Sequence, residues 1–270
     1  TKVTPVARRL ATERGIDLSV LTPGPDGVIG LNEVERAGVP RPKGRPARAD
    51  VAQMRKAIAA AMARANRDIP HYYVSSTIDM TPMMSWLSER NASQPTEKRL
   101  LYAAPLLRAV ALSFRKCPDL NGFYEDGQFR RAEKVNVGVA IATRGGGLIT
   151  PAILEADSCD VDSLMIRLND LVKRVRTGGL RSSELSMGTV TLTNLGERTA
   201  DAIMPIIYPP QVAIIGCGQI RSRPWVVDGA VVPRQLMEVT LAGDHRASDG
   251  RAGAQFLAFL ESLLAQPEVL

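Results

Sequence analysis

The stretch LMEVTLAGDHRASDG, residues 236–250, carries the strongest local signal in the chain. Val239 and Leu241 alternate with polar neighbours, a pattern that predicts a strand with one apolar face. The strand would deliver His245 into a turn, and a helix is expected to begin near Gly250, directly after an aspartate suited to an N-cap. The segment therefore predicts a strand, a turn and a helix in succession.

The rest of the chain alternates helical and strand patterns in the same way. Helices are expected at residues 50–70, from 81 onward, at 106–116 and at 160–178, and strands at 72–78, 135–143, 148–154, 189–195 and 211–215. Three glycines at 145–147 are expected to turn one strand back on the next. This order predicts an α/β fold, a mixed sheet with flanking helices.

The first 37 residues form a separate, shorter pattern. Thr4 and Pro5 suit the start of a first helix, and a second short helix is expected near residues 32–37. Residues 38–46 read GVPRPKGRP, with prolines, glycines and basic residues but no acid. We therefore expect a small all-α domain at 1–37, a linker at 38–49 and a large domain at 50–270.

Composition excludes several classes of function. Of the 270 residues, 45% are hydrophobic and 23% are charged, the proportions of a globular protein. No apolar run approaches the ~18 residues needed to span a bilayer, so no membrane segment is expected. The net charge is +6, but only 4% of the residues are aromatic and the basic ones are scattered, which argues against nucleic-acid binding. A phosphate-rich ligand or an acidic protein fits this charge better.

Cysteine and histidine usage narrows the chemistry further. Cys117, Cys159 and Cys217 lie far apart and are odd in number, which fits free thiols in a reducing compartment. We expect the bacterial cytoplasm, with the mitochondrial matrix as the alternative. Two histidines without a CxxC pair are too few close-spaced ligands for a metal, so none is expected. The chain does not begin with methionine, and an upstream segment is expected to be missing.

His245 and Asp249 are the first candidate site. A histidine at the end of a strand is well placed for proton transfer near neutral pH. Asp249 follows four residues later and can help to hold the loop. The alternative is a surface turn whose aspartate caps a helix, and the residues alone leave both interpretations open.

Other motifs are weaker. Thr193, in TVTLTNLG at 189–196, could donate a hydrogen bond to an oxyanion, although alternating threonines are ordinary in strands. VAIIGCG at 212–218 resembles a dinucleotide fingerprint, but the following residues do not open a helix, so we reject it. Cys217 is expected to be a buried thiol. His71 is expected to pack structurally, with a role as a second site histidine left open.

Taken together, these segments resemble the dihydrolipoamide acyltransferases, the E2 components of 2-oxo acid dehydrogenase complexes. Residues 1–37 resemble the peripheral subunit-binding domain, and residues 50–270 resemble the catalytic domain, whose fold is shared with chloramphenicol acetyltransferase. The matching segments follow in order: MRKAIAAAM (54–62), IPHYY (69–73), CPDLNG (117–122), VNVGVAIAT (135–143), GLITPAI (147–153), TLTNLG (191–196), PIIYPPQVAIIGCG (205–218) and DHRASDG (244–250).

The resemblance implies roles for particular residues. His245 corresponds to the catalytic base, Asp249 to the acidic or amide residue beside it, and Thr193 to the hydroxyl that stabilises the oxyanion. His245 follows Thr193 by 52 positions, the usual spacing in the family, where the two meet across a subunit interface in a trimer. A pairing of Arg55 with Asp249 is a further hypothesis. The implied substrates are coenzyme A and a lipoyl group, with acetyl expected as the acyl group.

The implied partners are a homotrimer or a higher core, and E1 or E3 subunits bound by the N-terminal domain. Arg8 and Arg9 match partner-binding positions, whereas Thr12 and Val28 stand where relatives often carry basic residues. No segment resembles a lipoyl domain, so the lipoyl group would come from a missing upstream segment or from another chain. The chain's last residues, QPEVL, are shorter than the apolar tail that often joins trimers in this family.

Two other functions compete with this one. A free-standing acyltransferase would use the same fold with an acyl-CoA donor and a small-molecule acceptor. A scaffold without catalysis would only dock partners, but such relatives commonly lose the histidine that this chain retains.

Overall fold

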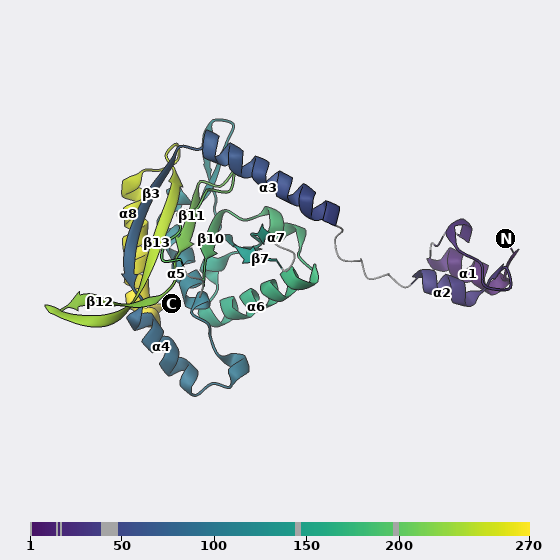
Figure 1. Ribbon diagram of the computed structural model, residues 1–270, viewed down its shortest axis with the longest axis horizontal. Coiled ribbons are helices and arrows are strands. Elements are labelled where there is room, and N and C mark those ends of the chain that lie inside the picture. Colours follow the sequence, from purple (N-terminus) through teal and green to yellow (C-terminus); the bar gives the residue numbers. More distant parts are fainter. Residues whose placement is uncertain (1, 15, 17, 39–47, 144–146, 197–199) are drawn as a thin grey trace. The chain divides into compact units, whose positions relative to one another are not determined.

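The computed structural model describes residues 2–14, 16, 18–38, 48–143, 147–196 and 200–270 (Figure 1). The chain divides into two compact units, Thr1–Met54 and Arg55–Leu270. Most of the expected linker at 38–49, and most of the expected glycine turn at 145–147, lie outside the described residues. The linker boundaries therefore stay a prediction.

The N-terminal unit is a small helical domain. It contains helices α1 (Pro5–Arg14) and α2 (Leu31–Gly38), a short 3-10 turn η1 (Leu18–Val20) and a parallel pair of two-residue strands, β1 (Lys2–Val3) and β2 (Val28–Ile29). The amide of Ala7 donates to Thr4 Oγ1 at 3.3 Å, so Thr4 caps α1 as expected. Its small core is made of Ala7, Ala11, Ile29 and Val34.

A seven-stranded sheet organises the larger unit. The strands lie in the order β12–β13–β11–β10–β6–β9, and β3 pairs with β13 (Figure 1). Their bounds are β3 (His71–Asp79), β6 (Val137–Val139), β9 (Ala152–Ile153), β10 (Val190–Asn194), β11 (Ala213–Cys217), β12 (Arg221–Val227) and β13 (Ala230–Asp244). Strand β10 is parallel to β6 and β11, whereas the other pairs are antiparallel. The expected mixed sheet with flanking helices is confirmed.

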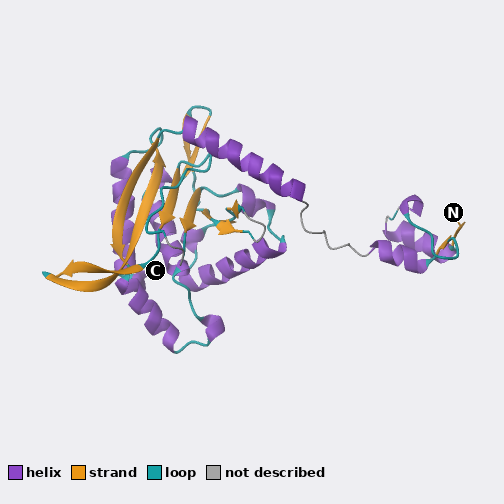
Figure 2. Ribbon diagram, viewed as in Figure 1, coloured by secondary structure: helices purple, strands orange, loops and turns teal. Residues whose placement is uncertain are grey.

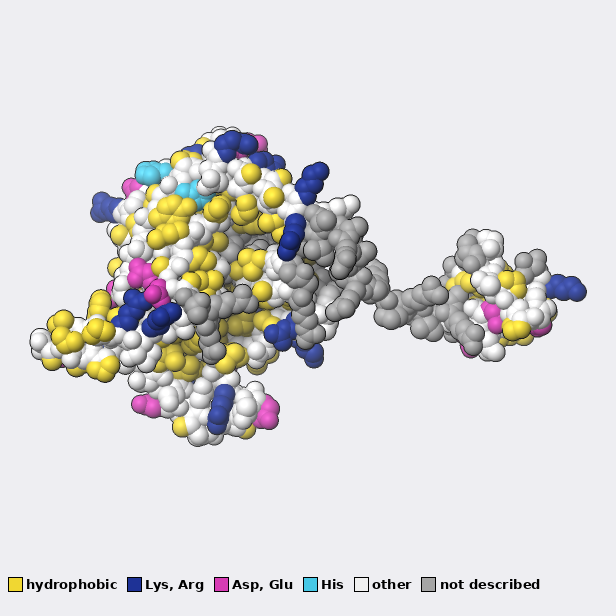
Figure 3. Space-filling view, viewed as in Figure 1, with side chains coloured by type: hydrophobic (Ala, Val, Ile, Leu, Met, Phe, Trp, Pro, Cys, Tyr) yellow, Lys and Arg dark blue, Asp and Glu magenta, His cyan; other side chains and the backbone are white. Residues whose placement is uncertain are grey.

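Strand β13 is central to this sheet, because it pairs with three other strands. It pairs with β3 along one edge and with β11 and then β12 along the other. Beyond the end of β3, only β12 and β13 remain, and they project as a two-stranded ribbon (Figure 2). Apolar side chains cover much of this ribbon (Figure 3), including the exposed Trp225, Val226 and Val231.

The helices cover mainly one face of the sheet. Against it pack α4 (Thr81–Ala92), α5 (Ala103–Lys116), α6 (Val161–Thr177) and α8 (Gly250–Ala265), whose apolar residues form the main core with those of the strands. Phe114 of α5 and Phe256 of α8 meet there with ring centroids 4.6 Å apart. Asp160 caps α6 at its start and Gly178 at its end, as the sequence predicts.

The opposite face carries a smaller cluster. Ala65 from α3 (Arg48–Asp68) and Ile69 pack there against Ile207, Ile214 and Ala242. The segment that precedes β11 also crosses this face, because a β-carbon at Gly216 would lie 2.4 Å from Ile203 Cγ2. Helix α3 and the segment before β11 therefore both cover parts of this face.

Two expected strands are interrupted. The expected strand 135–143 consists of β6 and β7 (Ile141–Ala142), and the expected strand 148–154 consists of β8 (Leu148–Ile149) and β9. Strand β7 pairs with β8, while β6 pairs with β10 and β9. Pro151 has no amide hydrogen to donate, which helps to explain the break between β8 and β9.

The remaining elements are short. They are the hairpin strands β4 (Gly122–Glu125) and β5 (Gln128–Arg131), helix α7 (Ser182–Ser186), and the 3-10 turns η2 (Thr96–Lys98), η3 (Pro118–Leu120), η4 (Ala156–Ser158) and η5 (Pro267–Val269). Among the described helices, none has the length and apolar character of a membrane span.

Candidate active site

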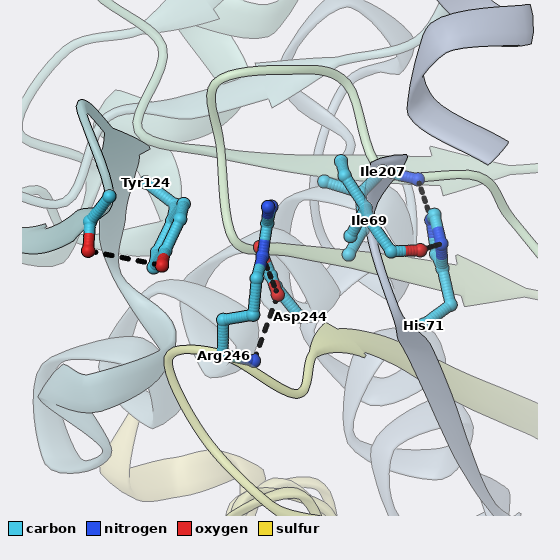
Figure 4. Close-up of polar contacts among 7 residues, drawn as sticks. Ile69, His71, Tyr124, Ile207, Asp244 and Arg246 are labelled. Carbon is cyan, nitrogen blue, oxygen red and sulfur yellow. Dashed lines mark hydrogen bonds and ion pairs between the residues drawn. The ribbon is translucent and has the colours of Figure 1, made fainter. Parts of the chain in front are cut away.

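The loop after β13 is held by an ion pair whose carboxylate is buried. Asp244, the last residue of the strand, is fully buried and receives Arg246 Nε at 2.9 Å and Nη2 at 2.7 Å (Figure 4). The backbone amide of Arg246 also donates to Asp244 Oδ1 at 2.9 Å. These bonds to Asp244 raise the pKa of Arg246, so its guanidinium stays protonated. The residue between them is His245.

Arg246 is also fixed from its other side. Its guanidinium carbon lies 4.0 Å from the ring centroid of Tyr124, in β4, a cation–π contact. The backbone of Tyr124 is anchored in turn, since its amide donates to the carbonyl of Pro210 at 2.9 Å. Sequence reasoning missed this contact, because more than a hundred residues separate its partners.

His245 combines a fixed backbone with an exposed imidazole. Its amide donates to the carbonyl of Pro70 at 3.0 Å. Its ring meets that of Tyr72 with centroids 5.4 Å apart and planes at 73°. Within the described part of the chain, no hydrogen bond to its ring nitrogens is recorded. Such an imidazole can exchange a proton with a substrate.

Asp249 caps helix α8. Its carboxylate accepts the amide of Ala252 at 3.0 Å, and its backbone is extended, as an N-cap requires. The structure records no hydrogen bond between Asp249 and His245, nor an ion pair with Arg55, among the residues it describes. Asp249 thus fixes the far end of the loop, and the expected contact with Arg55 is absent in the single chain.

Thr193 lies elsewhere on the sheet. It is half-buried near the end of β10 and pairs in register with Gly216 of β11, which pairs with Thr240 of β13. His245 comes five positions after Thr240. Thr193 and His245 are separated by two strand spacings across the sheet and by five residues along the strand direction. By standard strand geometry, their Cα atoms lie roughly 19 Å apart. One chain therefore does not bring these two residues together.

His71 is a structural histidine. Its Nε2 accepts the amide of Ile207 at 3.0 Å, and its Nδ1 lies 2.9 Å from the carbonyl oxygen of Ile69 (Figure 4). Because Nε2 accepts, Nδ1 carries the proton and donates to Ile69. Both ring nitrogens are thus used to tie β3 to the segment before β11, in line with the structural packing expected for it.

The other motifs have structural explanations. Residues 213–217 form a strand and 221–227 another strand, so no helix follows the glycines of VAIIGCG. Cys217 is fully buried, and burial raises its pKa to about 12, which makes its thiol a poor nucleophile. No group of three or more potential metal ligands occurs among the described residues.

A groove of about 550 Å³ lies beside the Tyr124 hairpin. Its wall includes the guanidinium-bearing Arg130 and Arg131, the ring of Tyr208 and the cis Pro209–Pro210 peptide. Arg130 pairs with Glu125 and Arg131 with Asp119. Paired arginines, aromatic rings and prolines thus line one groove next to the hairpin that carries Tyr124.

Arg8 and Arg9 lie on the exposed surface of α1 in the N-terminal unit. Neither is recorded in an ion pair within the described part of the chain. Their charges are therefore available to an acidic partner.

Comparison with known proteins connects these features. Residues 43–270 match the family model of the 2-oxoacid dehydrogenases acyltransferase catalytic domain, and residues 1–30 match that of the E3 binding domain. The acetyltransferase component of the Zymomonas mobilis pyruvate dehydrogenase complex is 27% identical over 98% of this chain, and its mitochondrial counterpart from Neurospora crassa is 30% identical over 97%. This chain covers 65% and 60% of the lengths of those two relatives.

Solved structures agree with the family match. Dihydrolipoamide acetyltransferase from Azotobacter vinelandii superposes with a TM-score of 0.75 and 27% identity, over 80% of this chain and 90% of that one. That structure was studied for the catalytic roles of a serine, a histidine 52 positions later and an asparagine 4 positions after the histidine. The cubic core of a pyruvate dehydrogenase complex superposes equally well, with a TM-score of 0.75, 28% identity and the same coverage of 80% and 90%. A match across most of the sequence, supported by the fold, shows that the chain belongs to the 2-oxoacid dehydrogenase acyltransferase family.

Proposed function

We propose that this chain transfers an acyl group between dihydrolipoamide and coenzyme A, as a core component of a 2-oxo acid dehydrogenase complex. The observation that carries the proposal is the exposed imidazole of His245, held between the Asp244–Arg246 ion pair and the cap of α8. Thr193, His245 and Asp249 have the same spacing, 52 and then 4 positions, as the serine, histidine and asparagine of the Azotobacter enzyme.

His245 acts as the base. A thiol has a pKa of about 8.5 and is mostly protonated at neutral pH. As the sulfur of coenzyme A attacks the acyl-lipoyl carbonyl carbon, the imidazole takes the thiol proton. The tetrahedral intermediate then expels the dihydrolipoyl sulfur, and the imidazolium returns the proton to it. One thioester replaces another, so no ATP is needed.

Thr193 acts on the oxyanion. Its hydroxyl is half-buried, and no hydrogen bond of that hydroxyl is recorded within the described residues, so it can donate to a developing negative charge. Removing such a donor costs about 10²–10³ in kcat in other enzymes. Because Thr193 and His245 lie roughly 19 Å apart in one chain by strand geometry, we propose that the hydroxyl comes from a second copy. A ring of three copies would then contain three such sites.

Asp249 supports the base rather than reacting. Its carboxylate fixes the start of α8 and hence the far end of the His245 loop. The groove beside Tyr124, with its two arginines, is the proposed location for part of the coenzyme. To bind phosphates of coenzyme A, the two guanidinium groups would exchange their pairs with Glu125 and Asp119 for phosphate oxygens.

Acetyl is the acyl group we propose first, because both relatives described above transfer acetyl. A lipoamide acyltransferase of the branched-chain complex from Pseudomonas putida is 30% identical over 98% of this chain, so larger acyl groups need testing as well. The match of residues 1–30 supports a proposal that the N-terminal unit binds E3, with Arg8 and Arg9 as contacts, and E1 is the alternative partner.

The test is an acyl-transfer assay with dihydrolipoamide and acetyl-CoA, isobutyryl-CoA or succinyl-CoA. We expect transfer by the wild type and a loss of at least a thousandfold in His245→Ala, with unchanged thermal stability. No transfer with any pair of substrates would contradict the proposal. Titration of E3 onto the chain, with Arg8→Ala and Arg9→Ala as comparisons, tests the docking proposal separately.

A further inference from the structure

Tyr72 lies where β3, β13 and α8 meet, directly against the His245 loop. Its cross-strand partner on β13 is Gly243. A β-carbon at Gly243 would stand 2.4 Å from Tyr72 Cζ, and one at Gly253 of α8 would stand 3.1 Å from Tyr72 Cε2. The tyrosine ring therefore fits between two glycines, which leave it little freedom to move.

The hydroxyl of Tyr72 reaches the loop itself. It shares a hydrogen bond of 2.8 Å with Ser248 Oγ, from a residue 176 positions later in the chain. The amide of Ser248 donates to the carbonyl of Asp244 at 3.1 Å, so the serine is itself fixed in the turn. Ser248 is the one hydroxyl-bearing residue in DHRASDG, which makes this bond specific to its position.

The same ring also contacts the imidazole. The centroids of Tyr72 and His245 lie 5.4 Å apart with planes at 73°, an edge-to-face geometry that aromatic rings favour. Burial raises the pKa of Tyr72, so its hydroxyl keeps its proton throughout the neutral range. Tyr72 thus contacts the imidazole through its ring and holds the following turn through its hydroxyl.

We propose that Tyr72, through its hydrogen bond to Ser248 and its contact with the imidazole, is a positioning residue that sets the direction in which His245 points. This inference rests on the proposed function, since it concerns the base of that reaction. It assigns no contact with substrate to Tyr72. A misplacement of about 1 Å at a reacting group can lower the rate about 10²-fold, so the loss of these two contacts should lower the rate measurably.

Kinetics of Tyr72→Phe, Ser248→Ala and the double variant test the hydrogen bond. Each single variant should lower kcat roughly tenfold, the value of one hydrogen bond, with KM for both substrates unchanged. Because both variants remove the same bond, the double variant should be no slower than either single one. Tyr73→Phe is the matched control: Tyr73 is the next residue, its ring lies on the other face of β3, and its kinetics should equal the wild type.

Two results would overturn the proposal: an unchanged kcat in Tyr72→Phe, or single losses that multiply in the double variant. A purely structural role would lower thermal stability while leaving kcat per folded molecule unchanged, and that outcome also contradicts it.

A spectroscopic test separates this proposal from the proposed function. The chain has two histidines, so a sample labelled with ¹³C-histidine gives two sets of ring signals. Tyr72→Leu should move the His245 signal, whereas Tyr73→Leu should move that of His71, whose ring stacks on Tyr73 at 5.9 Å. An inactive wild type would contradict the proposed function alone. A His245 signal left unmoved by Tyr72→Leu would contradict the positioning role alone.

Discussion

Gly243 lies directly beneath the ring of Tyr72, so a β-carbon at position 243 would stand 2.4 Å from Cζ and 2.5 Å from the hydroxyl oxygen of that tyrosine. Real side chains essentially never approach so closely. Gly243 immediately precedes Asp244 and the His245 loop, so the absence of one methyl group decides where an aromatic ring beside the proposed base can lie.

Gly243→Ala should therefore destabilise the protein by about 1–3 kcal/mol, the usual cost of overpacking. The ring of Tyr72 would have to leave its place, and activity should fall with it. Leucine at position 72 does not reach the space that Cζ occupies, so in the Tyr72→Leu background the same alanine should cost less than about 0.5 kcal/mol. Thermal unfolding of the four variants measures this coupling. Equal costs in both backgrounds would contradict the proposed contact.

His71→Ala should lower stability without acting on the chemistry. It removes the acceptor for the amide of Ile207, which is fully buried, and the donor to the carbonyl of Ile69. A buried amide left without a partner costs about 1–3 kcal/mol. His71→Gln, which can place an acceptor near the former Nε2, should cost less. Denaturant unfolding gives these values, and a His71→Ala protein as stable as the wild type would be inconsistent with the two bonds.

Some of this architecture follows from local sequence and some does not. The strand ending at Asp244, the cap at Asp160 and the helix after Asp249 follow from alternation and capping residues over fewer than twenty positions. Two hairpins were missed although each has an Asp-Gly turn. In the first turn φ is 53° at Asp126 and 77° at Gly127, and in the second it is 50° at Asp228 and 82° at Gly229. Positive φ at both residues is the type I′ geometry that this dipeptide favours.

The surroundings of the site could not be predicted in the same way. The contact of Arg246 with Tyr124 joins segments that are far apart in the sequence. The same holds for the contact of Tyr72 with Ser248, so only the fold brings these partners together. Neither tyrosine has a local pattern that distinguishes it from an ordinary strand residue. Motif resemblance indicated His245 and Thr193 and implied that they meet across a subunit interface, and the sheet register agrees that they lie on distant parts of one chain.

Arg246→Ala tests the ion pair between Arg246 and the buried Asp244. It would leave the buried carboxylate of Asp244 without its guanidinium partner, which should cost about 1–3 kcal/mol. Asp244→Asn in the same chain removes the buried charge and should recover part of that loss. Arg223→Ala is the matched control, because the pair of Arg223 with Asp201 is exposed and should contribute less than about 1 kcal/mol. Equal effects at the two arginines would contradict this difference.

Stability at low pH should depend on Glu184. This carboxylate, on α7, accepts from Arg174 on α6 and from the amide of Arg181, and the bond with Arg174 lowers its pKa below the ordinary 4.5. A lowered folded-state pKa stabilises the protein above pH 4.5, and this contribution is lost as the pH falls through the folded-state value.

Glu184→Gln should therefore be about 2 kcal/mol less stable than the wild type at pH 7, the value of a hydrogen bond to a charged group. The difference should shrink steadily below pH 4.5. Unfolding by urea at several pH values measures it. Glu261→Gln, at an exposed position of α8, should follow the wild type at every pH. A gap between Glu184→Gln and the wild type that stays constant down to pH 3 would rule out this linkage.

Mixed assemblies test whether two copies build one site. Thr193→Ala and His245→Ala each remove one half of the proposed pair, so neither variant alone should transfer acyl groups efficiently. If the hydroxyl and the imidazole come from neighbouring copies, a refolded equal mixture has one intact pair at about one interface in four, and should recover about a quarter of wild-type activity. If both groups come from the same chain, no mixture contains an intact pair.

Refolding the two variants together and assaying acyl transfer distinguishes these cases, with separately refolded proteins mixed afterwards as the control. Activity no higher than that control would show that the roughly 19 Å between Thr193 and His245 in one chain is not bridged by a second copy.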